Sequence, residues 1–492
     1  MNLSKSRYCR GIQCKKMLWL EKNKPEEKID INNESVLEQG NIIHEVARYL
    51  FGEHINIEYT DNLNEMIKDT YRTIESYKDI VITEASFNYN NNFCSVDILI
   101  KNNEKYEIYE VKSSTKVKDI YINDAAYQYY VLTNLGFNIT KCSIIVINTN
   151  YIRKEKIELN KLFLKQDITK EVINLQETVK SNINDINEYL KNEIEPLDDI
   201  DIKCHTPYDC PFFKYCTKHL PENNVFNLAN MKYNTKIELY KNNNYKYESL
   251  LKTNINDKYK QQIEFELYNK EDYIDIEKIK DFLNTLSYPL YFLDFETFAP
   301  PIPLYNNTSP FEKIPFQYSL HYIENKYGKL FHKEFLSEPN IDPRKKLAEN
   351  LINDIPKDVC ILAYNMSFEK SVIKKLAEDY PKYKEHLMNI YNNIKDLMIP
   401  FRDRSYYSKN MHGSYSIKKV LPSLFPNDES LNYQNLDLVH NGSEAMDNFA
   451  ALSSMNKEEY EYTRERLLRY CELDTYAMVK IYEKLQELVE KK

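Results

Sequence analysis

The stretch PLYFLDFET, residues 289–297, indicates the fold of the C-terminal part of the chain. It is rich in apolar and aromatic side chains and is typical of a buried strand. Because side chains two residues apart project from the same side of a strand, Asp294 and Glu296 share one face. The stretch therefore predicts an α/β domain whose first strand carries two acidic groups close together.

Two later motifs add acidic and phenolic groups to the same part of the chain. Residues 359–365, VCILAYN, predict a strand that runs into the helix SFEKSVIKKLAE, which holds Glu369 in its first turn. A long helix is predicted at about 456–490, and within it Tyr470 and Asp474 lie one turn apart on the same face. Together these motifs supply carboxylates, the ligand type that Mg²⁺ prefers.

The order and spacing of these motifs resemble those of the DEDD exonucleases of the proofreading, RNase H-like superfamily, in the branch with tyrosine in its last motif. The resemblance implies an RNase H-like domain over residues 286–492 that removes nucleotides 3′→5′ with two divalent cations, Mg²⁺ or Mn²⁺. In such a site Tyr470 would orient or deprotonate the attacking water, while Asn365 and Phe368 would shape and support the site. The implied metal ligands are Asp294, Glu296, Glu369 and Asp474. Glu369 stands where most relatives carry aspartate, and its longer side chain would change metal spacing or preference.

Three further polar residues of this domain have two interpretations each. Asp396, in IKDLMIPF, is either a reserve metal ligand or a structural residue. Lys418 and Lys419, in HGSYSIKKVLP, could bind a substrate phosphate or lie on a solvated helix face. The sequence by itself leaves both questions open.

Two strand-like stretches in the N-terminal part predict a hairpin that carries a second carboxylate group. Residues 93–100, FCSVDILI, and 105–114, KYEIYEVKSS, are joined by the turn-like KNNE. Folding them together brings Asp97 within a row or two of Glu110. The two carboxylates could hold Mg²⁺, and Lys112 could orient or deprotonate the attacking water. A solvent-facing pair of charged strands is the alternative.

Strand alternation also predicts which side chains share a face. It places Asp97 with Ser95 and Leu99, and it places Glu110 with Lys112 on the next strand.

Polar residues on the neighbouring predicted helices extend this pattern. His44 lies on the helix before the hairpin, and Gln128 follows Asp124 by one turn on the helix after it. The order His, Asp, Glu-x-Lys, Gln resembles the PD-(D/E)xK nuclease core of the RecB-like group, which implies a restriction-endonuclease-like domain over residues 1–220. The implied roles are metal binding for His44, Asp97 and Glu110, catalysis for Lys112 together with the two carboxylates, and DNA contact for Gln128. A structural histidine is the alternative for His44.

Four of the nine cysteines have a spacing that suggests a metal centre. One lies near the N-terminus and three follow in a C-x5-C-x5-C pattern: Cys14, Cys204, Cys210 and Cys216. They resemble the ligands of the iron–sulfur nucleases, which include the CRISPR-associated exonuclease of spacer acquisition and the AddB helicase–nuclease subunit. The resemblance implies a [4Fe–4S] cluster that joins the two ends of the nuclease domain, with Zn²⁺ as the alternative. The late trio lacks the C-x2-C pair frequent in those families, and Cys9 competes with Cys14 as first ligand.

Composition limits the class of protein. The 492 residues give room for about three domains, and 42% hydrophobic with 29% charged residues fits a globular chain. Neither a Walker A motif nor a dinucleotide fingerprint is present, in keeping with only 7 glycines. No apolar run approaches the ~18 residues of a membrane span, so we expect a cytoplasmic protein that does not bind membranes. Residues 221–285, rich in Asn, Lys and Tyr, predict a linker or helical bridge.

The whole layout resembles an uncharacterised bacterial family in which a RecB-like iron–sulfur nuclease is fused to a DEDD exonuclease-like domain. It implies a metal-dependent hydrolase of phosphodiester bonds, acting on DNA with a free 3′ end in repair, recombination or defence. The net charge of −9 does not favour binding of nucleic acid by bulk attraction, but divalent cations would offset acidic sites. A ribonuclease, a non-catalytic nucleic-acid-binding scaffold and a metal-dependent regulator are the alternatives.

Overall fold

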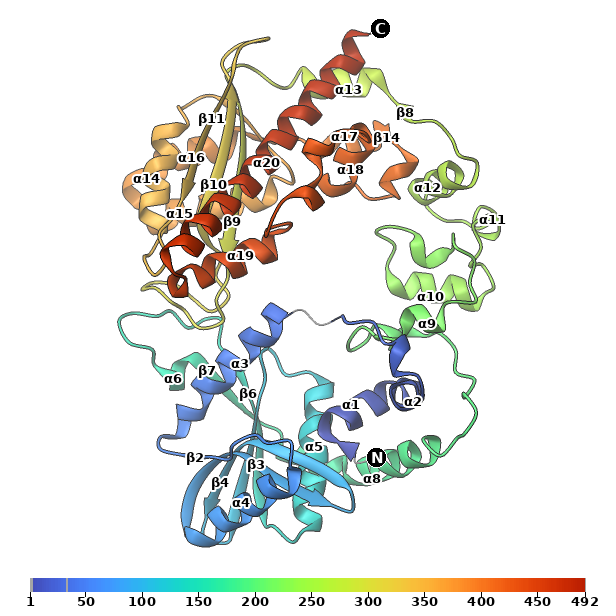
Figure 1. The fold of residues 1–492 in the computed structure, drawn as a ribbon, viewed down its shortest axis with the longest axis vertical. Coiled ribbons are helices and arrows are strands. Elements are labelled where there is room, and N and C mark those ends of the chain that lie inside the picture. The colour runs from blue at the N-terminus through green and yellow to red at the C-terminus, as the bar shows by residue number, and fades with distance from the viewer. Residues whose placement is uncertain (1–2, 32–33, 492) are drawn as a thin grey trace. The chain divides into compact units, whose positions relative to one another are not determined.

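The computed structural model describes residues 3–31 and 34–491, and these form a mixed α/β structure (Figure 1). The chain divides into two compact units, each assembled from two segments. The first comprises Met1–Leu220 with Pro300–Glu312, and the second comprises Pro221–Ala299 with Lys313–Lys492. None of the described helices is long and apolar enough to cross a membrane.

A seven-stranded sheet forms the centre of the first unit, with the order β2-β3-β4-β5-β6-β7 and β1 paired to β4. Its strands are β1 (Leu3–Ser4), β2 (Ile55–Asn56), β3 (Asp79–Tyr89), β4 (Asn92–Asn102), β5 (Lys105–Val111), β6 (Ile139–Ile147) and β7 (Phe163–Asp167). β3, β4 and β5 are antiparallel, whereas β5 and β6 are parallel. The register pairs Asn102 with Lys105, which confirms the predicted hairpin.

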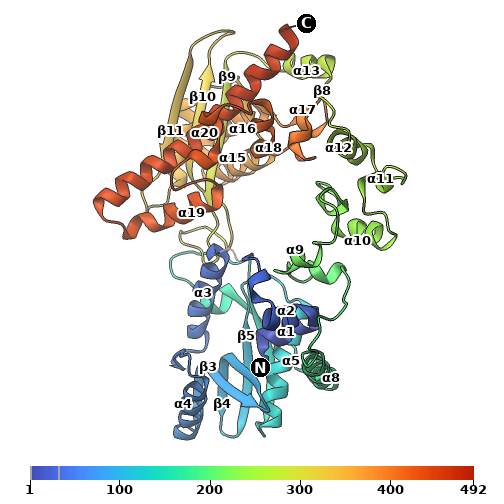
Figure 2. The same ribbon diagram turned by 45° about the vertical axis from the view of Figure 1, so that its right-hand side comes forward.

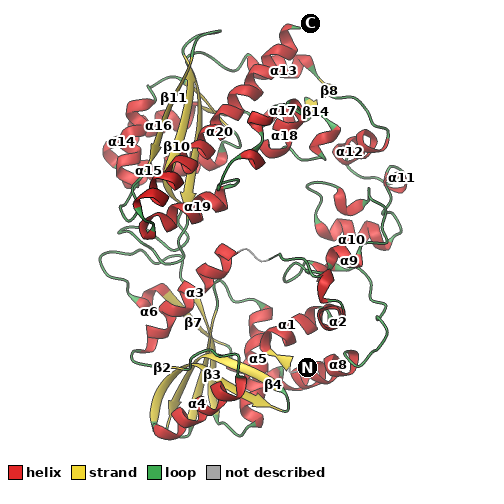
Figure 3. Ribbon diagram, in the orientation of Figure 1, coloured by secondary structure: helices red, strands yellow, loops and turns green. Residues whose placement is uncertain are grey.

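Helices cover both faces of this sheet (Figure 3). The larger core lies between one face and α1, α4, α5, α7 and α8, while α3 covers the smaller core on the other face. The helices are α1 (Lys5–Gln13), α2 (Lys15–Asn23), α3 (Glu34–Arg48), α4 (Leu63–Ser76), α5 (Asp119–Asn134), α6 (Leu159–Leu162), α7 (Thr169–Asn174), α8 (Gln176–Tyr189) and α9 (Phe213–Cys216). The sheet thus holds β5, which carries Glu110, between two helical layers.

The alternation of β4 is broken at Asp97, so the expectation that Ser95 and Leu99 share its face is wrong. Leu99 belongs to the larger core, whereas Ser95 is turned away from that core, where its Oγ lies 2.8 Å from the Oγ of Ser86. The physical cause lies in the neighbouring strand: Glu84 has a positive φ of 57°, a strained conformation for a residue with a side chain. The expectation that side chains alternate strictly along a strand fails here, because β3 and β4 both change face at the same row.

A five-stranded sheet forms the centre of the second unit, in the order β11-β10-β9-β12-β13. Its strands are β9 (Leu290–Phe298), β10 (Ile314–Ile323), β11 (Leu330–Leu336), β12 (Cys360–Ala363) and β13 (Ile394–Asp396). β9, β10 and β11 are antiparallel neighbours, while β12 runs parallel to both β9 and β13. The predicted strand at 289–297 is therefore the central strand of this sheet.

Helices also cover both faces of the second sheet, and Figure 2 shows α20 running along one of them. The apolar core lies between the other face and α14 to α16. The helices of this part are α14 (Arg344–Asp354), α15 (Ser367–Asp379), α16 (Lys384–Asn393), α17 (Ile399–Arg402), α18 (Ile417–Leu424), α19 (Gly442–Ala451) and α20 (Lys457–Glu490). The bounds of α20 confirm the predicted C-terminal helix.

The segment predicted as a linker or helical bridge, residues 221–285, belongs to the second unit. It folds into α10 (Tyr233–Lys241), α11 (Tyr247–Leu250), α12 (Asp257–Leu267), β8 (Tyr273–Ile274) and α13 (Ile276–Leu283). It has a small apolar core of its own, and β8 pairs with β14 (Tyr406–Tyr407). Its many tyrosines supply buried apolar surface, which is why a polar composition did not predict a packed segment.

Residues 300–312, expected in the C-terminal domain, pack with the first unit instead. The guanidinium of Arg153 donates hydrogen bonds to the carbonyls of Pro303 and Leu304 at 2.8 and 2.7 Å. Ile302 joins the smaller core of the first unit. This loop therefore belongs to the first unit, although the residues before and after it in the sequence belong to the second.

Helix α1 packs closely on α8 at Gly11, where a Cβ atom would lie 2.5 Å from Cδ1 of Ile186. We expect Gly11→Ala to destabilise the first unit by about 1–3 kcal/mol, because a crowded buried contact must shift. Gly40→Ala is the matched control, since no atom lies within 4 Å of its added Cβ. Denaturant unfolding of both variants would measure the difference, and equal midpoints would contradict the close packing of α1 on α8.

Candidate metal-binding sites

Three carboxylates of the second unit converge between β9 and α20. Asp294 and Glu296 project from β9, and Asp474 projects from α20, with one oxygen of each within 4.8 Å of the others. Glu369, in the first turn of α15, is only 2% exposed, and its Oε2 has no hydrogen-bond partner among the described residues. Buried oxygen ligands that lack a protein donor are what a hard divalent cation requires.

The electrostatics of this group show how strongly its members repel one another. Burial raises the pKa of Glu296 to about 8, and the charges of Asp474 and Glu369 add to the effect. Burial, together with the charge of Asp396, likewise raises the pKa of Glu369 to about 8. For Asp294, burial and the three neighbouring carboxylates raise the pKa well above its usual range. Two divalent cations would relieve this repulsion.

Two tyrosines border Asp474. Burial raises the pKa of Asp474 to about 6, although hydrogen bonds from the hydroxyls of Tyr433 and Tyr470 lower it. The Tyr433 hydroxyl donates to Oδ1 of Asp474 at 2.6 Å. Burial and the nearby carboxylates raise the pKa of Tyr470 far above its usual value, so it stays a phenol in the absence of a cation. Sequence reasoning missed Tyr433, because it lies in a single-turn 3-10 helix, Tyr433–Asn435, that has no clear sequence pattern.

Two lysines lie beside the acidic group. Lys418 opposes the rise in the pKa of Glu296 and Asp474, and its Nζ donates to the carbonyl of His440 at 3.0 Å. Lys313, which the sequence analysis did not select, opposes the rise in the pKa of Glu369. The structure therefore places Lys418 near the carboxylates.

The turn between β12 and α15 is held by Asp396. Its Oδ1 accepts the backbone N–H groups of Asn365 and Met398, each at 3.0 Å. Asn365 has a positive φ of 68°, and its carbonyl accepts the N–H of Phe368 at 3.2 Å. Of the two interpretations of Asp396, these contacts favour the structural one. Its hydrogen bond to Asn365 fixes the turn that leads to Glu369, and its bond to Met398 fixes the start of its own loop.

Three carboxylates of the first unit lie in one row across neighbouring strands. The flanking pairs Thr83↔Ile98 and Ala85↔Val96 place Glu84 opposite Asp97, and Ile98↔Tyr109 places Asp97 opposite Glu110. Oδ2 of Asp97 accepts the backbone N–H of Val111 at 2.7 Å, in place of a strand-to-strand hydrogen bond. The hydrogen bonding between strands is therefore interrupted at this row, and the carboxylate of Asp97 occupies the gap.

Two lysines stabilise the ionised form of Glu110. Lys5, at the start of α1, lies 2.8 Å from Oε1 of Glu110 and 3.2 Å from Oδ1 of Asp97. Lys112 lies 2.7 Å from the same Oε1 and 2.5 Å from Oδ2 of Asp124. Burial opposes ionisation of Glu110, but the two lysines outweigh it and hold its pKa far below the usual range. The pKa of Lys112 is raised in turn, because Asp124 and Glu110 outweigh the effect of its burial.

Gln128 is fully buried and donates from Nε2 to Oε2 of Glu110 at 2.7 Å. This position favours holding Glu110 in place over contacting DNA. His44 forms a group with Glu84 and Asp97 whose ligand atoms lie within 4.8 Å of one another. Sequence reasoning missed Lys5 and Glu84; the row across the strands could have revealed Glu84 once the register of β3 was known.

The four selected cysteines line one cavity of the first unit. Burial raises the pKa of each thiol, to about 12 for Cys210 and about 11 for Cys216. Their protons would therefore be displaced by a metal, whose charge stabilises thiolates. Cys9 lies elsewhere, in the larger core, where its pKa responds to Asp124 and Lys112. Cys14 rather than Cys9 is the first member of the set.

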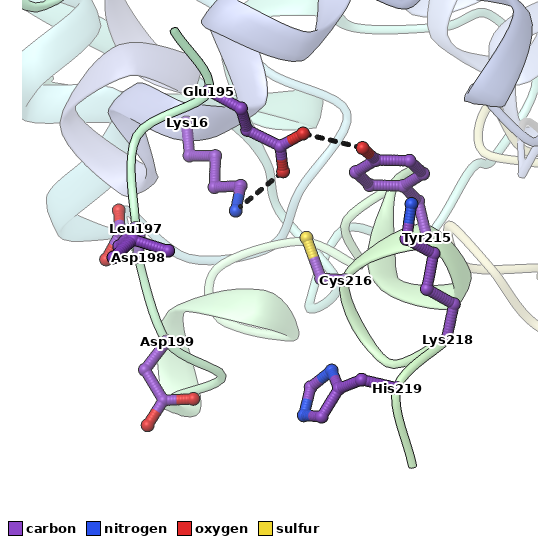
Figure 4. Close-up of a pocket in the computed structure, with 9 residues that line it drawn as sticks. All are labelled: Lys16, Glu195, Leu197, Asp198, Asp199, Tyr215, Cys216, Lys218 and His219. Carbon is purple, nitrogen blue, oxygen red and sulfur yellow. Dashed lines mark hydrogen bonds and ion pairs between the residues drawn. The ribbon is translucent and has the colours of Figure 1, made fainter.

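The walls of the cysteine cavity hold the N-terminal helices against the segment that follows α8. Nε2 of Gln13 donates to the carbonyls of Lys203 and Tyr208, both at 2.7 Å. Figure 4 shows Cys216 on an adjacent pocket, beside the Glu195 carboxylate that accepts from Lys16 and Tyr215. Protein contacts alone thus bring both ends of the unit together.

Comparison with known proteins places only part of the chain. Residues 291–416 match a family described as a domain of unknown function (DUF2779). The chain is 30% identical over 230 residues to the uncharacterized protein MG366 of Mycoplasma genitalium, which covers 44% of this chain and 34% of that protein. It is 27% identical over 220 residues to the MG366 homolog of Mycoplasma pneumoniae, covering 42% and 33%. The chain spans about a third of the length of these relatives.

The raised pKa values of the C-terminal carboxylates predict how stability changes with pH. In the absence of metal, we expect stability to fall as the pH rises from 4.5 to about 8, because folded Glu296 and Glu369 keep protons that the unfolded chain releases. Mg²⁺ should therefore raise the Tm more near the upper end of this window than near the lower end.

Thermal unfolding across this pH window, with EDTA or with Mg²⁺, measures the effect. The variant Glu296→Gln/Glu369→Gln is the control, because its side chains cannot ionise, and its pH dependence should be flatter. A pH profile parallel to that of the wild type would contradict the assignment.

The cysteine cavity predicts a selective loss of metal. We expect Cys210→Ser to abolish visible iron–sulfur absorption, or to remove one zinc per chain, and to lower the Tm of the first unit, because one of four ligands is lost. Cys9→Ser should keep the metal. Metal analysis of anaerobically purified protein tests both variants, and equal metal content in Cys210→Ser and wild type would exclude the cavity as the binding site.

Proposed function

We propose that the chain is a divalent-metal-dependent nuclease that hydrolyses phosphodiester bonds in DNA. The observation that carries this proposal is the convergence of Asp294, Glu296 and Asp474, with the buried Glu369 in the same unit, whose Oε2 has no hydrogen-bond partner among the described residues. Buried oxygen ligands fit hard cations such as Mg²⁺ or Mn²⁺, because their charges repel one another without them. The resemblance to DEDD exonucleases gives the reaction and the 3′→5′ direction.

The position of the group within the sheet supports an RNase H-like active site. The strand order changes direction between β9, which continues to β10, and β12, which continues to β13. In open α/β sheets, ligands bind at the carboxyl ends of strands beside such a switch point. Asp294 and Glu296 lie on β9, and Glu369 follows β12, so the acidic group lies where a substrate is expected.

In this site the ions would activate the attacking water and offset charge on the leaving oxygen. The remaining roles in the proposed reaction belong to side chains of the protein. The four carboxylates bind the ions, and the protonated Tyr470 orients the water through its hydroxyl. Tyr433 fixes the rotamer of Asp474 through its 2.6 Å hydrogen bond. Lys418 lies near Glu296, and Lys313 lies near Glu369. Both lysines would attract the phosphates of a single-stranded 3′ end.

For the first unit we propose a second nuclease site, in line with its resemblance to PD-(D/E)xK enzymes. His44, Asp97 and Glu110 would bind the cation, and Glu84 would add a fourth ligand, a third carboxylate oxygen, to the same opening. Lys112 would orient or deprotonate the attacking water and offset charge on the scissile phosphate. Lys5 contacts both Asp97 and Glu110, so it would turn toward the substrate phosphate when a cation binds between them.

The four cysteines would hold a [4Fe–4S] cluster, with Zn²⁺ as the alternative. The role we propose is structural, because the cavity joins α1 and α2 to the segment after α8 and is not shared with the carboxylate row. A bound metal would add covalent links to an interface that hydrogen bonds already form.

A nuclease assay with single-site variants tests the proposal. The substrates are 5′- and 3′-labelled single- and double-stranded DNA and RNA, with Mg²⁺, Mn²⁺ or EDTA. The proteins are wild type, Lys112→Ala, Asp294→Ala and the double variant. We expect Asp294→Ala to lower 3′→5′ removal of nucleotides by at least about a hundredfold, because the proposed site loses one of its carboxylate ligands. Lys112→Ala should remove a different set of products.

The outcomes separate the alternatives. Activity confined to RNA would make the protein a ribonuclease with the same chemistry. Loss of all activity in Asp294→Ala but none in Lys112→Ala would leave one catalytic unit. Four equally inert proteins, each folded by circular dichroism, would contradict the nuclease proposal and favour a binding scaffold.

A further inference from the structure

Two histidines and a glutamate of the second unit form a cluster that the proposed nuclease site does not use. His321 of β10 and His332 of β11 face each other in register, with ring centroids 4.4 Å apart. Glu472 of α20 completes the group, and one ligand atom of each residue lies within 4.8 Å of the other two. Imidazole nitrogens with a carboxylate are typical ligands of Zn²⁺.

A chain of hydroxyl groups holds one nitrogen of each histidine. Nε2 of His332 lies 2.9 Å from Oγ of Ser319, which lies 2.7 Å from Oγ1 of Thr475. Nδ1 of His321 lies 2.8 Å from the same Oγ1. The Thr475 hydroxyl donates to the backbone carbonyl of Glu472 at 3.1 Å. The direction of the last bond determines the others.

Counting protons along this chain gives one self-consistent assignment of the tautomers of both rings. When the Thr475 hydroxyl donates to the Glu472 carbonyl, it accepts from both Ser319 and His321. Ser319 has then used its own proton, so it accepts from Nε2 of His332. Neutral His321 is therefore protonated on Nδ1 and His332 on Nε2. The lone pairs are left on Nε2 of His321 and Nδ1 of His332.

This arrangement leaves the lone pairs where a metal would need them. Nδ1 of His332 lies 3.9 Å from Oε1 of Glu472. Metal-binding histidines commonly donate their second ring N–H to a protein acceptor, which fixes the orientation of the ring. Without a cation, two lone pairs and a carboxylate would face one another.

The cluster is also accessible from solvent. His321 is 4% exposed, but the side chains of His332 and Glu472 are 24% and 48% exposed. Glu334, two residues after His332 on β11, is close enough for its pKa to respond to both of these groups. A cation could therefore enter without unfolding, and Glu334 or water could fill the remaining coordination position.

We propose that His321, His332 and Glu472 bind a Zn²⁺ ion through Nε2, Nδ1 and a carboxylate oxygen, respectively. Two nitrogen ligands select Zn²⁺ over Mg²⁺, which prefers oxygen. The ion would fasten α20 to the β10–β11 hairpin. Because α20 also carries Tyr470 and Asp474, the ion would position these two residues without contacting the substrate. The zinc site does not depend on the proposed nuclease function.

Zinc binding by the full chain tests the proposal. The anaerobically purified protein is treated with a chelator, supplied with Zn²⁺ in a large excess of Mg²⁺, and analysed for bound zinc. The variants are His332→Ala, Glu472→Gln and the control Glu461→Gln, which removes one exposed acidic charge from the same helix. We expect wild type and Glu461→Gln to bind one more zinc per chain than His332→Ala. Glu472→Gln should weaken that site at least about tenfold.

A second readout separates this site from the cysteine cavity. Co²⁺ bound at His321, His332 and Glu472 should give visible d–d absorption without the sulfur charge-transfer band of a thiolate site. Equal zinc content in wild type, His332→Ala and Glu472→Gln would overturn the proposal, even if His332→Ala alone misfolds. Zinc binding with an inactive nuclease would leave this proposal standing and remove the other.

Discussion

The charge of buried carboxylates is the constraint on which both candidate sites depend, because each unit holds acidic side chains away from water and must balance their charge. In the second unit, Asp294 lies among three other acidic groups, and burial raises their pKa values. The folded chain can hold such a group only with protons or cations. The apolar core on the far side of the sheet supplies the stability that offsets this cost.

The two units compensate for this charge by different means. In the first unit, Lys5 and Lys112 form ion pairs with Glu110, whose pKa is held far below its usual range. In the second unit, Lys418 and Lys313 only reduce the rise in the pKa of Glu296 and Glu369, respectively. In the absence of metal, bound protons therefore neutralise most of the charge of these carboxylates. The first site is thus preorganised by cations of the protein itself, whereas the second has the greater need for added ions.

Helix α20 links several features of the second unit. Its one face supplies Tyr470 and Asp474 to the acidic group, and Glu472 points to the two histidines on the neighbouring strands. Thr475 bonds to both Ser319 and His321, so a change at the histidine cluster would be transmitted to the helix that carries the proposed catalytic tyrosine. In the first unit the segment around the cysteine cavity has a comparable place, since Gln13 of α1, the helix that carries Lys5, donates hydrogen bonds to the carbonyls of Lys203 and Tyr208.

The sequence by itself determined the α/β class, the hairpin that pairs Asp97 with Glu110, the bounds of α20 and the regular spacing of Cys204, Cys210 and Cys216. These follow from periodicity, turn residues and spacing, which are local properties of the chain. Only the tertiary structure identified Glu84, Lys5, Tyr433 and Lys313 as neighbours of the carboxylates. It also placed residues 300–312 in the first unit and brought His321 beside Glu472. Local patterns could not show these contacts, because they join residues far apart in the sequence through strand register, a strained φ at Glu84 and the packing of α20.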